Sequence, residues 1–226
     1  MTKIDTVICV HGFWSHGVGL YLIKRRLESE YGMRALLFNY PSVRGSLDDN
    51  ADALAEFITT ESPDGAHIIA HSLGGVVSLR MLANHRDAPP GRLVCLGSPL
   101  TGSRAADFLT RQDWAEPLVG LSLSAGVVTA PASTWAMDVC EQRDVGVVAG
   151  DASIGVAQFV ADFEEENDGT IGISETQLHG IRDHLILPVS HNGMLISSRV
   201  VDQAAAFLRR GEFLRDSTSA PVAKPT

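Results

Sequence analysis

Short apolar runs alternate with amphipathic stretches along the first hundred residues of the chain. The runs are rich in β-branched residues and end at glycine, proline or polar residues, which is typical of buried parallel strands. The stretches between them repeat apolar residues at helical spacing. The expected strands are 4–10, 34–40, 66–70 and 92–97, and the expected helices are 19–31, 48–60 and 74–85.

This strict alternation predicts βαβ units with right-handed crossovers. Two further strands are expected at 145–149 and 185–188, and a last helix at 198–209. The predicted fold class is therefore α/β, with three α/β/α layers and a mostly parallel sheet of about six strands covered by helices on both faces.

The middle and the end of the chain have weaker patterns. Residues 98–144, with short helices expected at 104–114 and 134–140, are interpreted as a small cap or substrate-loop region. The 215–226 segment is small and polar and contains proline, so we expect it to be disordered. The remaining 1–214 are predicted to form one domain, because their length suits a single core.

Charge and composition exclude several classes of protein. A formal net charge of -9 would repel phosphate backbones, so nucleic acid is not an expected partner. The three cysteines are an odd number without metal-ligand spacing, which predicts neither a disulfide framework nor a metal site. The acidic run 164–166 is interpreted as a solvated face.

The chain enters its first strand at once and has no apolar run that could span a bilayer. We therefore expect a cytoplasmic protein without stable membrane insertion. Oligomeric state has no signal in these residues.

The sequence AHSLGG at 70–75 connects an expected strand directly to an expected helix. A nucleophile elbow has this context, because its sharp turn exposes a serine at the end of a parallel strand. The residues two before and two after the serine must be small, and Ala70 and Gly74 meet that need. Ser72 is therefore the predicted nucleophile.

A helix that begins directly after Ser72 places unpaired N–H groups beside the nucleophile. The Leu73 N–H is then one donor for an oxyanion hole. A second donor is expected from the bend at 10–13, where glycine permits the Phe13 N–H to turn towards the site.

Four of the eight histidines compete for the role of general base. His191 follows an expected strand and precedes the last helix, on a loop that can bend back over Ser72. His184 begins the same strand at its opposite end. His71 adjoins the nucleophile and is expected to point elsewhere, and His11 is expected to organise the oxyanion loop by hydrogen bonding.

Two aspartates compete for the acid that orients the histidine. Asp168 lies in the turn-forming sequence NDGT at 167–170, where a glycine lets the carboxylate face inward. Asp151 follows the strand expected at 145–149 more directly. The residues alone leave both candidates open.

The whole constellation resembles the small bacterial lipase and esterase branch of the α/β-hydrolase family. The matching segments are VHGF at 10–13, AHSLGG at 70–75, GSPL at 97–100, NDGT at 167–170 and SHNGML at 190–195. The resemblance implies the three-layer hydrolase fold and a catalytic triad of Ser72, Asp168 and His191. It also implies Phe13 and Leu73 as the oxyanion donors.

The resemblance further implies a serine esterase that cleaves small-molecule or lipid-like carboxylic esters through an acyl-enzyme, without cofactor or metal. A thioesterase or acyltransferase would use the same triad with a different leaving group or acceptor. A catalytically silent binding protein that retained the elbow is the alternative from another class. An active-site serine probe distinguishes it from an enzyme.

Overall fold

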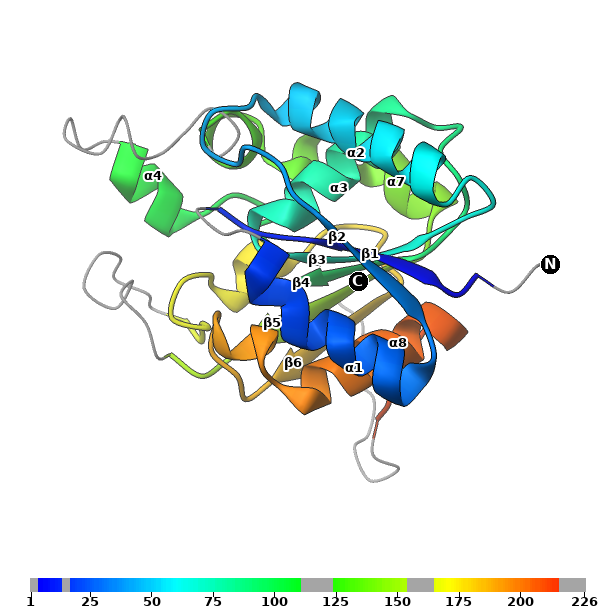
Figure 1. The fold of residues 1–226 in the computed structure, drawn as a ribbon. Coiled ribbons are helices and arrows are strands. Elements are labelled where there is room, and N and C mark those ends of the chain that lie inside the picture. The colour runs from blue at the N-terminus through cyan, green and yellow to red at the C-terminus, as the bar shows by residue number, and fades with distance from the viewer. Residues whose placement is uncertain (1–3, 14–16, 111–123, 154–164, 216–226) are drawn as a thin grey trace.

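A computed structural model describes residues 4–13, 17–110, 124–153 and 165–215 of the chain. These residues form a six-stranded sheet in the order β2-β1-β3-β4-β5-β6, and each neighbouring pair is parallel (Figure 1). The strands are β1 (Thr6–Val10), β2 (Arg34–Phe38), β3 (His67–His71), β4 (Leu93–Leu96), β5 (Val145–Gly150) and β6 (Asp183–Leu187).

Helices cover both faces of this sheet. One face carries α1 (Tyr21–Tyr31) and α8 (Ser198–Arg210), and the other carries α2 (Leu47–Glu61), α3 (Leu73–Asn84) and α7 (Met137–Gln142), as Figure 1 shows. The short α4 (Arg104–Thr110) projects from one edge of the sheet. The predicted three-layer α/β/α fold is confirmed.

Short helical turns complete the structure. They are the 3₁₀ turns Gly17–Leu20, Ala132–Thr134, Ile173–Thr176 and Gly193–Leu195 and the π-helical turn Ser124–Thr129. Among the described residues, no helix combines the length and the apolar character that crossing a bilayer requires.

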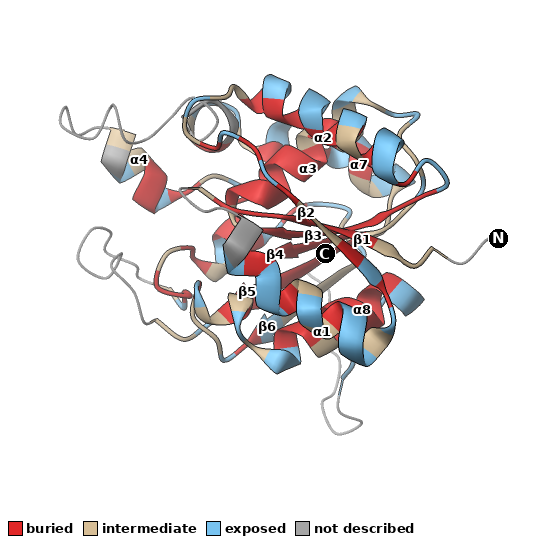
Figure 2. Ribbon diagram, in the orientation of Figure 1, coloured by how far each residue is buried: buried red, intermediate tan, exposed pale blue. Residues whose placement is uncertain are grey.

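The core lies in two layers, one on each face of the sheet (Figure 2). Successive strand residues point to opposite faces, so Ile8 and Val10 pack towards α2 and α3 while Val7 and Cys9 pack towards α1 and α8. Because both faces are covered, the central strands β1, β4 and β5 are buried at nearly every position rather than alternately. This explains why continuous apolar runs in the sequence marked the strands.

The expected strands and the four long helices form within two residues of their predicted boundaries. The helix expected at 134–140 is wrong as one element, because the chain leaves helical geometry at Trp135, whose φ is -140°. The Trp135 indole N–H turns back to donate to the Ala130 carbonyl at 3.0 Å. The helix expected at 104–114 forms over Arg104–Thr110, and 111–114, like 216–226, lie outside the described residues.

The strand order sets the position of a crevice. From β1 the chain crosses to β2 on one side and then returns past β1 to β3 on the other side. The direction of winding therefore reverses between β1 and β3. In open parallel sheets, the carboxyl ends of strands at such a switch point form the ligand-binding crevice.

Candidate active site

Ser72 lies in the sharp turn between β3 and α3, with φ 54° and ψ -126°. Among the described residues it is the only non-glycine residue with positive φ. A side chain in this region of φ and ψ is strained, and such strain collects at functional sites. The turn is held on its strand side because the Ser72 N–H donates to the Leu96 carbonyl of β4 at 2.8 Å.

Gly74 shows why the turn needs a small residue after the serine. A Cβ built on Gly74 would lie 2.6 Å from the carbonyl oxygens of both Val10 and His11. The backbone at the end of β1 therefore packs directly against the start of α3. Any larger residue at position 74 would push these two segments apart.

Asp168 and His191 form a buried pair at the same edge of the sheet. The His191 Nδ1 lies 2.7 Å from Asp168 Oδ2, and the two residues are 8% and 1% exposed. The His191 backbone N–H also donates to the Asp168 carbonyl at 2.8 Å. Because a carboxylate can only accept, Nδ1 carries the proton and Nε2 keeps a free electron pair.

The second oxygen of the Asp168 carboxylate is used by its own loop. Oδ1 accepts from the backbone N–H groups of Thr170 at 2.9 Å and Ile171 at 2.7 Å. Both oxygens of this side chain thus have fixed partners. The orientation of the carboxylate towards His191 is therefore set by the backbone of the 168–171 turn.

Gly97, directly after β4, connects the pair to the serine. A Cβ on Gly97 would lie 2.9 Å from Asp168 Oδ2 and 3.1 Å from His191 Nδ1, and its φ of +54° favours glycine. The preceding residue, Leu96, accepts the Ser72 N–H. The carboxyl end of β4 is thus next to the serine turn through Leu96 and next to the Asp168–His191 pair through Gly97.

Asp151, the competing aspartate, is not part of this cluster. It is exposed, and its backbone N–H donates to the Leu187 carbonyl at 3.1 Å. The space over the end of β5 is taken by Asp168, because a Cβ on Gly150 would lie 2.8 Å from Asp168 Cβ. Asp168 lies further along the chain from β5 than Asp151 does, so proximity in sequence to this strand could not identify it.

His71 lies differently from the sequence expectation. Instead of pointing away from the site, its Nε2 donates to the His191 carbonyl at 3.0 Å, and the two imidazole rings are 4.6 Å apart. Burial, reinforced by the neighbouring His191, lowers the pKa of His71 to about 3. His71 is therefore a neutral support for the loop that carries His191.

His11 has the organising role expected of it. Its Nδ1 donates to the Gly12 carbonyl at 2.8 Å, and its Nε2 accepts the Tyr40 backbone N–H at 3.3 Å. The Tyr40 ring stacks on the imidazole with 4.4 Å between centroids. His184 lies at the start of β6 and contacts Thr176 Oγ1 at 2.9 Å.

The predicted oxyanion donors lie on either side of the serine. A Cβ on Gly12 would be 2.9 Å from Ser72 Cβ, so the loop that continues to Phe13 runs against the nucleophile. Leu73 is the first residue of α3, where helix geometry leaves the backbone N–H without an intrahelical acceptor. Both segments are therefore adjacent to the serine.

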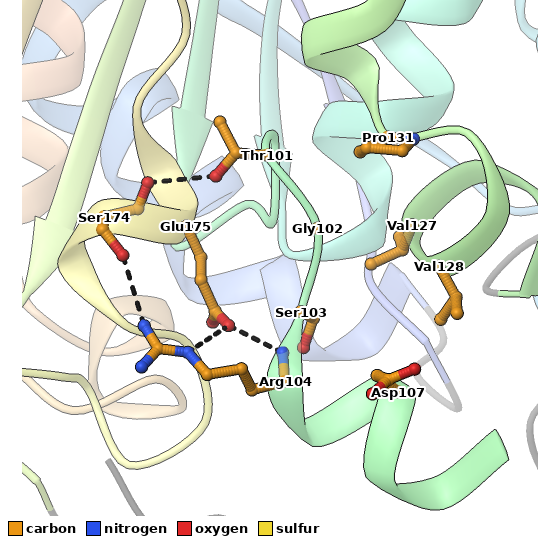
Figure 3. Close-up of a pocket in the computed structure, with 10 residues that line it drawn as sticks. All are labelled: Thr101, Gly102, Ser103, Arg104, Asp107, Val127, Val128, Pro131, Ser174 and Glu175. Atoms are coloured by element: carbon orange, nitrogen blue, oxygen red, sulfur yellow. Dashed lines mark hydrogen bonds and ion pairs between the residues drawn. The ribbon is translucent and has the colours of Figure 1, made fainter. Parts of the chain in front are cut away.

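A cavity of about 360 Å³ lies beside the loop that continues from Gly97 (Figure 3). Val127, Val128 and Pro131 form one wall, and polar side chains form the other. The polar wall contains Glu175, a glutamate that the sequence did not single out, and Arg104 pairs with both Glu175 and Glu165. Within the described ranges, no group of three or more His, Cys, Asp and Glu side chains is arranged to hold a metal ion.

Glu165 departs from the interpretation of the acidic run as a solvated face, whereas Glu166 is exposed as expected and residue 164 lies outside the described residues. The Glu165 carboxylate forms an ion pair with Arg104, accepts from the Ser174 hydroxyl at 2.6 Å and accepts from the Ser174 backbone N–H at 3.2 Å. Only the fold brings these residues together, because they are up to 70 positions apart in sequence.

A parallel sheet covered on both faces, with a strained serine between a strand and the following helix, defines the class of α/β hydrolases. The chain belongs to the alpha/beta hydrolase family, whose model matches residues 7–220. This finding agrees with the resemblance seen in the sequence motifs. No curated protein matches the chain.

Solved structures share the fold at low sequence identity. The mature form of the Bacillus licheniformis lipase BlEst2 is 17% identical with a TM-score of 0.67, and 92% of each chain is covered. A hydrolase from Oleispira antarctica is 10% identical with a TM-score of 0.66, again over 92% of each chain. The RedJ thioesterase of Streptomyces coelicolor is 16% identical with a TM-score of 0.55, over 93% of this chain and 91% of its own.

Proposed function

We propose that the protein is a serine esterase that hydrolyses carboxylic esters through an acyl-enzyme intermediate. Ser72 is the nucleophile, His191 the general base and Asp168 the acid that orients the histidine. The observation that carries the proposal is the buried Asp168–His191 hydrogen bond of 2.7 Å beside a strained serine at a strand-to-helix turn. Strain and burial of this kind are costly, so their coincidence supports a functional assignment.

The position of the proton on the His191 ring fits this chemistry. Since His191 donates through Nδ1 to Asp168, Nε2 is the atom left to accept the Ser72 hydroxyl proton. The Ser72 oxygen then attacks the carbonyl carbon, and the imidazolium returns its proton to the leaving alcohol. Water, activated by the same histidine, releases the acid from Ser72. Asp168 stays ionised and stabilises the imidazolium.

The Leu73 and Phe13 backbone N–H groups are the proposed oxyanion donors. Leu73 lies at the positive end of α3, so the helix dipole adds to its hydrogen bond. Removal of one such donor typically costs about 100- to 1000-fold in kcat. Because both donors belong to the backbone, side-chain substitution at these positions does not remove them.

The proposal also assigns a class of substrate. Structural relatives include a lipase and a thioesterase, and their shared fold at under a fifth identity supports acyl chemistry without fixing the acyl acceptor. We assign small-molecule or lipid-like esters on the sequence resemblance to lipases and esterases.

The first test is hydrolysis of p-nitrophenyl esters from acetate to palmitate, together with a matched acyl thioester. Ester turnover is expected to exceed thioester turnover, and Ser72→Ala is expected to lower kcat by about 10⁶-fold. A strong preference for the thioester would move the protein to the thioesterase class.

Asp151→Asn is the matched control for this assay. It makes the same chemical change as Asp168→Asn at an exposed aspartate of the same sheet edge. The control is expected to hydrolyse esters like the native protein. Equal losses in the two variants would reject the assignment of Asp168.

A further inference from the structure

Glu175 is a buried carboxylate that the proposed chemistry does not use. It is only 5% exposed, although burial of a charged group is costly unless hydrogen bonds replace its water. Its carboxylate accepts three N–H groups. Oε1 accepts from Arg104 N at 2.7 Å and Arg104 Nε at 3.2 Å, and Oε2 accepts from Gly172 N at 2.9 Å.

The backbone of the same residue makes a second set of bonds. The Glu175 carbonyl accepts the N–H groups of Leu100 at 2.7 Å and Thr101 at 3.1 Å. One residue therefore joins the loop after β4, the start of α4 and the end of the loop that carries Asp168. Figure 3 shows Glu175 between Ser174 and Arg104 on the polar wall of the cavity.

The bond to Gly172 acts on the Asp168 loop at a defined point. Gly172 pairs with Asn167 across an isolated antiparallel bridge, and Ile173 N donates to Glu166 O at 3.0 Å. Asp168 follows Asn167 immediately and lies inside the turn that this bridge closes. A shift of Gly172 would therefore move the Asp168 carboxylate relative to His191.

The other loop that Glu175 holds also leads to the pair. Leu100 and Thr101 follow Gly97, and the Gly97 backbone packs against Asp168 Oδ2 and His191 Nδ1. Glu175 thus ties together the two segments that contact the proposed acid–base pair.

Capping of α4 does not explain Glu175. Ser103 already caps this helix, because its Oγ accepts the Ala106 N–H at 3.2 Å. The Arg104 side chain is 45% exposed and has Glu165 as a second carboxylate partner, so it does not need a buried one. Glu175 also closes the start of its own 3₁₀ turn through Gly172. Beyond that local role, it links the two loops.

We infer that Glu175 is a positioning residue for the Asp168–His191 pair, acting by fixing Gly172 against the start of α4. The inference rests on the proposed function of that pair. Glu175 touches neither Asp168 nor His191 through its carboxylate, so its contribution is geometric. Displacement of a reacting group by 1 Å can cost about 100-fold in rate. Accurate positioning of the pair can therefore compensate for the stability lost by burying the Glu175 charge.

The test is Glu175→Gln, which keeps the shape of the side chain but places an NH₂ group against an N–H donor. The expected result is a fall in kcat of about 10-fold with KM within about twofold of native. The proton NMR resonance of the hydrogen between His191 Nδ1 and Asp168 Oδ2, which lies far downfield in short hydrogen bonds, is expected to move upfield or broaden.

Asp144→Asn is the matched control. It weakens the 2.9 Å ion pair between the partly buried Asp144 and Arg92, which lie at the amino ends of β5 and β4, opposite to the proposed active site. It is expected to lower the melting temperature while leaving kcat and the downfield resonance unchanged. The inference would be overturned if Glu175→Gln behaved like this control.

A second variant and a measurement without substrate keep failure of this inference distinguishable from failure of the proposed function. If Glu175→Gln does not fold, Arg104→Lys keeps the backbone donor and the positive charge but loses the Nε bond, and the same readouts should change by a smaller amount. The NMR resonance needs no substrate. It therefore decides the positioning role even if Ser72→Ala retains activity and the esterase proposal fails.

Discussion

The two ends of the parallel strands carry the same kinds of polar side chain with different partners. We call the side of the sheet where the strands end the carboxyl edge and the side where they begin the amino edge. At the carboxyl edge the buried carboxylate of Asp168 bonds to His191. At the amino edge the carboxylate of Asp144 pairs with Arg92, and His67 Nδ1 accepts the Arg92 backbone N–H at 2.9 Å. A carboxylate beside an arginine faces a permanent charge, whereas one beside a histidine faces a group that can gain and lose a proton.

The comparison teaches that the partner, and not the burial, distinguishes the structural group at the amino ends of the strands from the pair that we propose to be reactive at their carboxyl ends. His67 is as buried as His191, yet its ring is fixed by a backbone N–H donor at the start of β4. Burial, reinforced by the Arg92 charge, lowers the pKa of His67 to about 4. It therefore remains neutral at physiological pH and accepts a backbone N–H at the start of β4.

The largest expected effect comes from removing the charge of each carboxylate. Asp168→Asn should lower kcat about 10⁴-fold, because the amide no longer holds His191 in the tautomer that leaves Nε2 free. Asp144→Asn should leave kcat within about twofold and cost about 1 kcal/mol of folding free energy. Steady-state ester hydrolysis and urea unfolding measure the two quantities.

Equal effects of the two substitutions on kcat would contradict the distinction between the edges. A loss of folding free energy without a loss of kcat in Asp168→Asn would show that this carboxylate has the structural role.

The next effect concerns pH and the amino-edge histidine. In the unfolded chain a histidine has a pKa near 6.5, so the unfolded state binds a proton before folded His67 does as the pH falls. Stability from this residue is therefore complete above pH 6.5 and is lost between pH 6.5 and about 4, by about 2 kcal/mol from pH 7 to pH 5.

His67→Asn, which retains an acceptor for the Arg92 N–H, should remove that part of the pH dependence. Urea unfolding at pH 7 and pH 5 measures the change, and His71 and His184, whose pKa values burial also lowers, contribute to the pH dependence that remains. An unchanged dependence would show that His67 is not held neutral by burial.

The last pair of substitutions tests two glycines that both have positive φ. Gly97→Ala places a Cβ 2.9 Å from Asp168 Oδ2 and should lower kcat about 100-fold. Gly211→Ala, at the end of α8 with φ +82°, meets Asp144 Oδ2 only at 3.3 Å and should cost about 1 kcal/mol of stability without loss of kcat. Comparable kcat values in the two variants would contradict the account of Gly97.

The sequence predicted the elements that depend on local pattern. The sheet was readable because its central strands are apolar on both faces, and the serine turn was readable because Gly74 must be small where β1 and α3 approach. His191 was selected from its place between the last strand and the last helix; the structure pairs it with Asp168, and its role as general base stays a prediction. These features need only a short stretch of chain.

The remaining features depend on contacts between distant segments. Asp168 could not be distinguished from Asp151 by position, because the return of the chain over the end of β5 leaves no periodic pattern. Glu175 looked like an ordinary loop glutamate until Gly172 and Arg104 were placed around it. His71 was expected to point elsewhere because its contact with His191 spans 120 residues.

The central claim is tested most directly by locating the nucleophile with a fluorophosphonate probe, which phosphonylates activated serines. Intact-mass and peptide analysis of the folded protein should find one adduct, on Ser72, with none in Ser72→Ala and greatly slowed labelling in His191→Ala. Labelling of a different residue, or no labelling of the folded native chain, would contradict the account and favour a hydrolase fold without hydrolase chemistry.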